Sequence, residues 1–503
     1  MQLLYRKSIC LEHMSARLPI LHKTPFVLDP RPLVEASSAH VGALAISRAF
    51  RSLGLPGSIA ANLKLRKRQR GFSEGQMIES VVLLQTIGGD CPDDVRLLAN
   101  DPCLERGLGY RPPKVTAVRE FLELFHDESL EEMRPARSEQ KSFILPSSGP
   151  VAALSQVQCG CVRQIAKLYQ QKGETQRIAT IDQDATIIES HKQAALAHYD
   201  DGRGYQPMVA LWAELDLVVA DEFRDGNVPA KQAPLTCAQM AFGALPDSVK
   251  TRYFRGDSAC HENKLIQWLI SPERALEAGG AIGFGISAVM SPDLAKAVAA
   301  VDEQQWKTIR TEEDGTLRQW AEVVFVPGEA SEKKDSKPLR YVGLRLLKPQ
   351  GVLFADGSDR KHHAVVSNLW DWEGARLLEW HREKAGTIEH THDEVKNGLG
   401  GGHMPSQRFA VNAVWFKMAL LTYNIISAIK RLCFEPEHRN ARLKKFRLLL
   451  VHVMGRMNRN NCVMGLRMQA SVETIRRMQK VWEMFELPTQ ATASVALGRG
   501  KAG

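Results

Sequence analysis

Paired cysteines, a targeting signal and a membrane-length apolar run are all missing from this sequence. Nine cysteines are scattered through 503 residues, and none forms a CxxC pair. Such an odd, irregular set argues against a disulfide framework and for reduced thiols in a cytoplasm. Residues 1–21 mix charged and apolar residues and have no signal-peptide core. No apolar run approaches the length of a membrane span, so we expect no membrane partner.

Negative charge is missing from one long stretch near the C-terminus. Residues 438–471 contain no Asp or Glu but many arginines and lysines. The whole chain has a formal net charge of +9 and a pI of about 9.0. This balance favours a polyanionic partner, of which nucleic acid is the commonest. The residues of this stretch that we expect to bind phosphates are Arg442, Lys444 and Lys445.

A second basic run, KLRKRQR, lies near the N-terminus. It is either a solvated helix end or a segment that grips phosphates. Its candidate contacts are Lys64, Arg66, Lys67 and Arg68. The segment 41–130 around it has helical periodicity, and Ser73 begins a capping box before an apolar run. The proline-containing residues 1–40 predict a poorly ordered lead-in, and 131–156 predict a linker.

The composition is that of an ordinary globular protein, with 44% hydrophobic and 24% charged residues. The length allows two or three domains. A strand is predicted at 177–190, followed by further strands between 204 and 370. The apolar segment 409–432 predicts a core helix, and the segment 446–468 predicts a hairpin that turns at Asn458 to Asn461.

Acidic residues sit inside or at the tips of two of these strands. Asp182 and Asp184 share one face of the strand at 177–190. Buried carboxylates are costly unless a cation or a metal compensates them, so this pattern indicates a site. Asp257 follows a short strand, at a position that is either a helix cap or a ligand-binding tip.

The stretch 380–403 concentrates charge in front of a glycine-rich end. We expect a helix from Ile388 with Thr387 as its N-cap. One face of this helix is either solvated or offers a carboxylate to a metal and a cation to a phosphate. Its members are Glu389, His392, Asp393 and Lys396.

Asp184, Asp257 and Glu389 together suggest a two-metal site for phosphodiester chemistry, with Asp182 as a further candidate ligand. Hard oxygen ligands favour two ions of Mg²⁺ or Mn²⁺ over zinc. Lys396 and Arg382 are then candidates to hold phosphates.

The motif order resembles that of the DDE transposases of bacterial insertion sequences, and more narrowly the insertion-sequence family numbered thirteen-eighty. Glu389 followed by Lys396 matches the E-x6-K half of that family's signature, but Arg382 and Ala385 stand where its tyrosine and arginine belong. A one-residue slip would use His381 and Lys384 instead. The other matching segments are Asp184-Ala185-Thr186, GYQP, FRDGNV, Arg255-Gly256-Asp257-Ser258 and Ala364-Val365-Val366-Ser367-Asn368.

The resemblance implies an α/β fold with an RNase H-like mixed-sheet core flanked by helices. It implies the three carboxylates as catalytic metal ligands, with Lys384 and Arg255 added to the DNA contacts. It also implies a homodimer on double-stranded DNA in a bacterial, nucleoid-associated cytoplasm, cleaving inverted-repeat ends and transferring strands into a target. The implied domains are a helical DNA-binding domain at 41–130, core parts at 157–284 and 361–432, a β-rich insertion at 285–360, and a basic C-terminal region at 433–503 with a hairpin and a helix.

Three alternatives remain open at this stage. The histidines near Glu389 allow a hydrolytic zinc site, although HTHDE is not an H-E-x-x-H motif. An RNase H-like nuclease that cleaves without transfer is a second alternative. A DNA-binding protein without activity, such as a decayed transposase, is the third.

Overall fold

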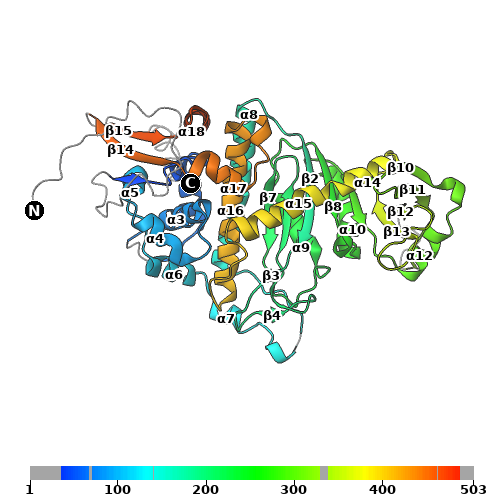
Figure 1. Cartoon of the computed structure of the whole chain (residues 1–503). Coiled ribbons are helices and arrows are strands. Elements are labelled where there is room, and N and C mark those ends of the chain that lie inside the picture. The colour runs from blue at the N-terminus through cyan, green and yellow to red at the C-terminus, as the bar shows by residue number, and fades with distance from the viewer. Residues whose placement is uncertain (1–35, 67–70, 140, 329–337, 461–462, 488–503) are drawn as a thin grey trace, which may run out of the picture.

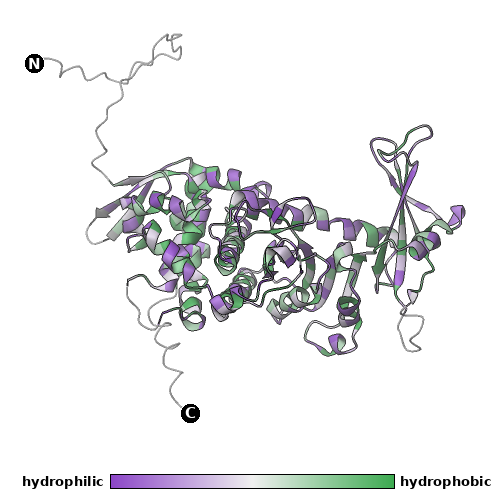
Figure 2. Cartoon of the chain, turned by 90° about the horizontal axis from the view of Figure 1, so that it is seen from below, coloured by the Kyte–Doolittle hydropathy of each residue, from purple (hydrophilic) through white to green (hydrophobic). Residues whose placement is uncertain are grey.

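The computed structural model describes residues 36–66, 71–139, 141–328, 338–460 and 463–487. The molecule is elongated: a helical head lies at one end, a large sheet in the middle and a β-rich region at the other end (Figures 1 and 2). Most of the expected lead-in at 1–40 lies outside the described residues. The described cysteines are all free thiols, as the spacing predicted.

A nine-stranded mixed sheet forms the centre, in the order β10-β11-β12-β13-β9-β8-β2-β6-β7. Strand β2 pairs antiparallel with β6, which pairs antiparallel with β7. On its other side β2 pairs in parallel with β8, and β8 with β9. The bounds are β2 Ile178–Ala185, β6 Met208–Trp212, β7 Leu217–Glu222, β8 Thr251–Gly256 and β9 Ile282–Ser287.

The strand expected at 177–190 is interrupted after Ala185. The chain then enters a small three-stranded sheet in the order β3-β5-β4. Because of this interruption, Asp184 lies next to the C-terminal end of β2 rather than in the middle of a longer strand. The small sheet consists of β3 Ile188–Glu189, β4 Leu196–Ala197 and β5 Arg203–Tyr205.

The strands expected between 280 and 370 are present and extend the main sheet. Strand β13 pairs antiparallel with β9, so the β-rich region is hydrogen-bonded to the core sheet. It has a separate hydrophobic cluster in which Trp320, Val342 and Leu377 are buried. The outer elements are β10 Lys307–Thr311, β11 Leu317–Val323, β12 Arg340–Leu347, β13 Arg360–Ser367 and α12 Pro292–Ala299.

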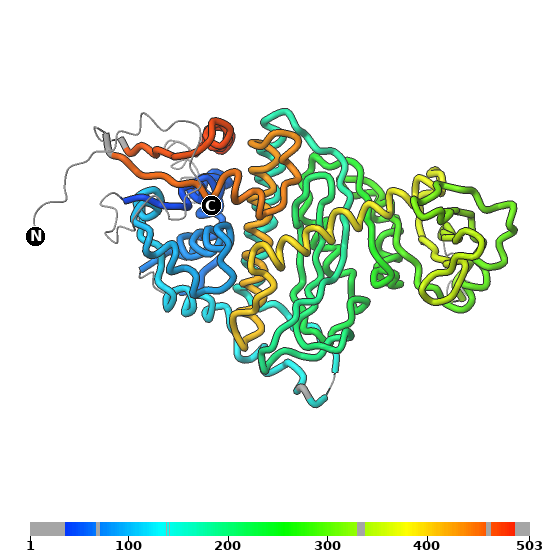
Figure 3. The backbone as a smooth tube through the Cα atoms, viewed as in Figure 1, coloured from blue at the N-terminus to red at the C-terminus, as the bar shows by residue number. Residues whose placement is uncertain are grey.

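Helices cover the sheet, which makes the chain a mixed α/β protein. Helices α14 and α15 (yellow in Figure 1) cross from the β-rich end over the sheet toward α16. The tube in Figure 3 shows the same path without the ribbons. The covering helices are α8 Gly149–Gln171, α9 Pro234–Ala244, α10 Asn263–Ile270, α14 Gly374–Arg382, α15 Lys384–Asp393 and α16 Phe409–Cys433.

Helix α16 is the buried core helix that the apolar segment 409–432 predicts. Among the described residues it alone is long and apolar enough to span a membrane, yet 94% of its most apolar window is buried inside the protein. It covers the outer edge of the sheet, where Asn424 accepts from the Val218 amide and donates to the Val218 carbonyl, both at 2.7 Å. A side-chain amide thus replaces a neighbouring strand at the edge of β7 that pairs with no other described strand.

The helical head confirms the predicted capping box. The Ser73 hydroxyl accepts from the Gln76 amide, and the Gln76 side chain accepts from the Ser73 amide. The glycine at position 42 permits close contact with the C-terminal region, because an added Cβ would lie 1.7 Å from the Leu450 carbonyl oxygen. The head contains α1 Ala43–Ser52, α2 Leu55–Asn62, α3 Glu74–Ile87, α5 Pro102–Leu108 and α6 Val115–Glu123.

The C-terminal region returns to the head, as Figure 1 shows. The predicted hairpin is confirmed: β14 (Met454–Asn460) and β15 (Val463–Gln469) pair antiparallel, and its expected turn partly lies outside the described residues. Strand β1 (Ser37–Ser38) completes this three-stranded sheet. Two helices flank the hairpin in sequence, α17 (Leu443–Phe446) and α18 (Val472–Met484).

Replacing Asn424 by Ala should destabilise the fold, because it leaves both polar backbone groups of Val218 buried without partners. We expect a loss of about 2–5 kcal/mol in the free energy of unfolding, measured by urea denaturation. The control is Asn62→Ala, since Asn62 is exposed and donates only to the Ser58 carbonyl. Equal losses in the two variants would contradict the edge-capping role of Asn424.

Candidate active site

Two of the predicted carboxylates meet at one edge of the main sheet. Asp184 is near the end of β2, and Asp257 directly follows β8. These strands are parallel neighbours, so their carboxyl ends lie at the same edge. Asp184 and Asp257 line one cavity of about 860 Å³, together with Ser258 and the exposed side chain of Lys231. Asp257 also caps the following turn by accepting from the Ala259 amide.

The wall of this cavity is mostly apolar but carries two polar side chains, each with an amide oxygen that lacks a hydrogen-bond partner among the described residues. These side chains are Gln206 and Asn227, and both oxygens are buried. Unpaired buried acceptors are costly unless a ligand or water donates to them. The cavity therefore suits a polar ligand.

Burial dominates the electrostatics of Asp184, and two neighbouring charges act on it in opposite directions. Burial, together with the charge of Asp257, raises the pKa of Asp184 to about 6, although Lys384 opposes this shift. The Lys384 ammonium lies 3.5 Å from Asp184 Oδ2. His392 Nε2 lies 3.9 Å from the same oxygen. Burial, followed by the charges of Lys396 and Lys384, lowers the pKa of His392 to about 3, so this imidazole adds no positive charge.

The helix that carries Glu389 begins earlier than the sequence predicted. Helix α15 starts at Lys384, directly after α14, and Thr387 lies inside it rather than at its N-cap. The Thr387 hydroxyl instead bonds to the Lys384 carbonyl and to the carboxylate of Asp182. The expectation that Thr387 caps the helix is wrong, because α14 and α15 form a nearly continuous rod.

Glu389 lies on the exposed side of α15. It makes no hydrogen bond or ion pair with the described residues, so its carboxylate is free. His392, three residues further on and adjacent on the helix surface, is the side chain that approaches Asp184. The helix that carries Glu389 therefore contacts Asp184 through a neighbouring residue, but the Glu389 carboxylate does not join the two aspartates.

The described residues contain no group of three or more His, Cys, Asp or Glu side chains arranged to hold a metal ion. This speaks against the zinc alternative built on His390, His392 and Glu394. Glu394 is also committed elsewhere, since it is buried and accepts from the Leu443 amide at 2.5 Å. The oxygen donors Asp184 and Asp257 nevertheless fit one side of a site for a hard divalent cation, because their combined charge is only partly compensated.

Asp182 and Arg255 do not take the roles expected of them. Asp182 is fully buried, and Arg255 binds both of its oxygens: Nε to Oδ1 at 2.6 Å and Nη2 to Oδ2 at 2.9 Å. Asp182 does share a strand face with Asp184, but it lies deeper, beneath α15. Arg255 is only 2% exposed, so the structure does not support Asp182 as a metal ligand or Arg255 as a DNA contact.

The other predicted cations near the site differ in accessibility. Lys384 is buried against Asp184, so it faces the carboxylates rather than solvent. Lys396 is half-buried and donates to the Ile187 carbonyl at 3.2 Å. Arg382 is exposed and lies 3.7 Å from Glu312. Of these three, Arg382 and Lys396 retain access to a large ligand.

The basic C-terminal segment packs against the end of the Glu389 helix. Arg442 pairs with Asp393 at 3.1 Å, and the Leu443 side chain lies against Gly398. Lys444 and Lys445 are exposed beside this contact. The cations predicted from the acid-free stretch thus lie next to the active-site helix.

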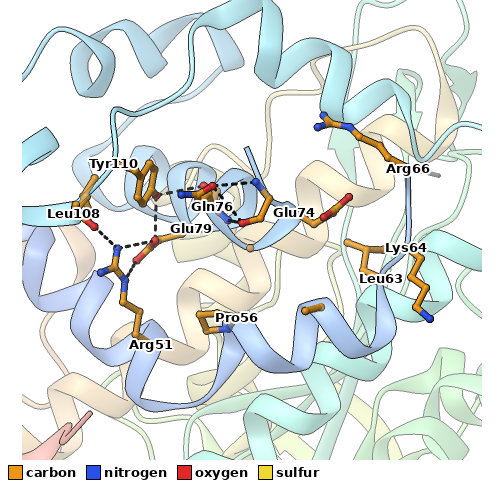
Figure 4. Close-up of a pocket in the computed structure, with 14 residues that line it drawn as sticks. Arg51, Pro56, Leu63, Lys64, Arg66, Glu74, Gln76, Glu79, Leu108 and Tyr110 are labelled. Atoms are coloured by element: carbon orange, nitrogen blue, oxygen red, sulfur yellow. Dashed lines mark hydrogen bonds and ion pairs between the residues drawn. The ribbon is translucent and has the colours of Figure 1, made fainter. Parts of the chain in front are cut away.

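The N-terminal basic run borders a second cavity, of about 580 Å³, in the helical head (Figure 4). Lys64 is exposed and Arg66 half-buried at its rim, and Lys67 and Arg68 lie outside the described residues. Within the cavity Glu79 accepts from Arg51 at 2.8 Å and from the Tyr110 hydroxyl at 3.0 Å. Arg51, Glu79 and Tyr110 thus pair with one another inside the cavity. We infer that these groups stabilise the helical head rather than take part in catalysis.

The sequence reasoning missed the inward roles of three residues on α15. Lys384, Thr387 and His392 all face β2, whereas the sequence predicts Lys384 as a DNA contact, Thr387 as a cap and His392 as a member of a face that is either solvated or part of a site. A signal was present: with a helix starting at Lys384, positions 384, 388, 391 and 395 form a buried stripe. Placing the start at Ile388 hid this stripe.

Comparison with known proteins gives a family. The model of the transposase DDE domain group 1 matches residues 35–488. A cryo-EM structure of a piggyBac transposase synaptic complex with hairpin DNA is similar over 92% of this chain and 82% of that one, at 9% identity and a TM-score of 0.38. No curated protein matches significantly. Because the family model spans nearly the whole described chain, including both aspartate strands and the Glu389 helix, this protein belongs to the DDE transposases, enzymes that cleave and join DNA.

Proposed function

We propose that this transposase cleaves DNA at the inverted-repeat ends of its element and transfers the ends into target DNA by two-metal phosphoryl transfer. The observation that carries this proposal is the meeting of Asp184 and Asp257 at the ends of adjacent parallel strands, where both line one cavity. The sequence motifs support a narrower placement in the insertion-sequence family numbered thirteen-eighty. A homodimer on double-stranded DNA in a bacterial cytoplasm is part of the same proposal.

The core of this enzyme is, in our proposal, RNase H-like. The support comes from the strand order: β2, β6 and β7 form an antiparallel meander, and β8 and β9 follow in parallel on the other side of β2. The helices α8, α9 and α15 contact this part of the sheet. The proposed insertion at 285–360 would then be an extension of the core sheet, since β13 pairs with β9.

The proposed metal ligands are Asp184, Asp257 and Glu389, for two ions of Mg²⁺ or Mn²⁺. When bound, the ions would lower the pKa of the attacking water or 3′-hydroxyl and stabilise the leaving oxygen. Asp184 and Asp257 would form the fixed part of the site, because both are held by strand ends. Glu389 would close it, and its freedom from other contacts supports this role.

Lys384 has a separate role in this proposal. Its ammonium partly neutralises Asp184 and so limits the repulsion between the two aspartates. A lysine can fill this role because it offers a compact charge at the end of a flexible stem. Lys384 would therefore keep the carboxylates close together rather than bind DNA.

The proposed DNA contacts are exposed or half-exposed cations on two regions. Their support is the position of Arg442, Lys444 and Lys445 beside the Glu389 helix. Phosphate contacts of this kind position a duplex without reading its sequence. The remaining proposed contacts are Lys396, Arg382, Lys64 and Arg66. The nuclease and relic alternatives are not favoured by the family match.

Single changes of Asp184, Asp257 or Glu389 to Ala should abolish cleavage of a labelled duplex that carries the element's inverted repeat. We expect each to lower the cleavage rate in Mg²⁺ at least about 100-fold, because each removes a group that stabilises transition-state charge. DNA binding, measured by a mobility shift, should be largely retained. The controls are Asp293→Ala and Glu120→Ala, which remove exposed acids on other helices. Full cleavage by any one of the three variants would refute the assignment of that residue.

Replacing Lys444 and Lys445 together by Ala should weaken DNA binding and reduce its salt dependence. Loss of two phosphate contacts should lower the slope of log K against log [salt] by about 2. Fluorescence anisotropy with a labelled duplex at several salt concentrations measures this slope. The matched control is Lys264→Ala with Lys296→Ala, two exposed lysines on α10 and α12. An unchanged slope in the Lys444 and Lys445 variant would contradict the proposed contact.

A further inference from the structure

Three polar residues, of which Asp182 and Arg255 are buried and Thr387 is half-buried, have the same sequence spacing to the three proposed catalytic carboxylates. Asp182, Arg255 and Thr387 each precede one of Asp184, Asp257 and Glu389 by two positions. Arg255 donates two hydrogen bonds to Asp182, and the Thr387 hydroxyl donates to the same carboxylate. The three residues, called here the clamp, connect β2, β8 and α15.

The ion pair of the clamp depends on how β2 and β8 are aligned. Asp182 and Arg255 are paired positions of the parallel strands β2 and β8. Asp184 lies two positions after Asp182 on the same face of β2. Asp257 directly follows the end of β8, two positions after Arg255. A bidentate pair at one level of the sheet therefore sets the level at which the next two carboxylates face each other.

Arg255 extends the clamp to the preceding helix. Its Nη1 donates to the Trp380 carbonyl at 2.6 Å and to Glu383 at 3.0 Å. The guanidinium also lies 5.2 Å from the centroid of the Trp380 ring. These contacts hold the end of α14 directly before α15 begins, so one guanidinium positions both strands and the helix rod.

Thr387 fixes where α15 crosses β2. Its hydroxyl reaches Asp182, whereas Lys384 and His392, a turn before and after it, approach Asp184. A shift of α15 along β2 would break the Thr387 bond and would carry Glu389 away from the end of the strand. The hydroxyl thus couples the position of the third carboxylate to the other two.

We propose that Asp182, Arg255 and Thr387 are positioning residues: Asp182 and Arg255 align Asp184 with Asp257, and Thr387 sets the position of the helix that carries Glu389 relative to this pair. They act through Asp184, Asp257 and Glu389 and touch neither metal nor DNA. This inference rests on the proposed function, since it concerns the geometry of the same metal site. Groups that orient metal ligands without binding the metal commonly change metal affinity or activity about 10–100-fold when they are replaced.

The test compares threonine variants on one helix. Thr387→Val removes the hydroxyl and keeps the shape of the side chain, and Thr387→Ser keeps the hydroxyl. The matched control is Thr391→Val: Thr391 is buried on the same helix, but its hydroxyl bonds to the Thr387 carbonyl and contacts Tyr423 on α16. Asp182→Asn provides a second disruption of the clamp from the strand side.

Mn²⁺ binding to the full chain, measured from the free-ion signal in electron paramagnetic resonance, is the first readout. The second is the Mg²⁺ concentration for half-maximal cleavage of the inverted-repeat duplex. We expect Thr387→Val and Asp182→Asn to weaken Mn²⁺ binding and to raise the Mg²⁺ requirement at least about tenfold. Thr387→Ser and Thr391→Val should stay within about twofold of the wild-type protein, even if Thr391→Val lowers the melting temperature.

Wild-type Mn²⁺ affinity in folded Thr387→Val protein would overturn the proposal. An equal loss in Thr391→Val would also overturn it, because it would trace the effect to general stability. Failure of the proposed function gives a different pattern, in which Asp184→Ala keeps its cleavage activity. If Asp184→Ala loses cleavage while Thr387→Val binds Mn²⁺ normally, the clamp alone is refuted.

Discussion

The parallel pairing of β2 with β8 is the constraint on which the rest of this structure depends. It brings two carboxylates from residues 73 positions apart in sequence to one edge of the sheet, as seen for Asp184 and Asp257. It also buries Asp182 opposite Arg255. A buried ion pair contributes little to stability unless its hydrogen bonds are complete, and here Thr387 and the end of α14 complete them.

The remaining architecture supports this edge from both sides. Helix α16 covers β7 and contacts α15 through the hydroxyls of Tyr423 and Thr391, 3.2 Å apart. The basic C-terminal segment then closes over the end of α15, where Glu394 accepts from the Leu443 amide. The two aspartate strands, the Glu389 helix and the basic segment are thus joined through polar contacts, although they come from distant parts of the chain.

Much of the fold could be predicted from local sequence patterns. The capping box at Ser73, the core helix at 409–432 and the strand that ends at Gly256 follow from side-chain chemistry and periodicity, and the structure contains all three. The interruption of the strand after Ala185 and the start of α15 were not predicted. Both depend on tertiary contacts, since the chain after β2 pairs with β5 and Thr387 bonds to Asp182.

The site could be predicted in type more readily than in detail. The alternation of side chains along a strand predicts that Asp182 and Asp184 lie on one face, but it does not predict how deeply each side chain is buried. Only the packing of α15 over β2 separates a carboxylate enclosed by Arg255 from one that lines the cavity. The basic character of Arg255 was equally visible in sequence, whereas its burial depends on the pairing of β2 with β8.

The central claim is that Asp184 and Asp257 form the fixed half of a divalent-cation site. Isothermal titration of Mn²⁺ into the full chain tests it most directly, with the wild-type protein compared to the double variant Asp184→Asn and Asp257→Asn. We expect saturable binding to the wild-type protein and its loss in the double variant, with the melting temperature showing that the variant is folded. Equal Mn²⁺ binding by the two proteins would contradict it.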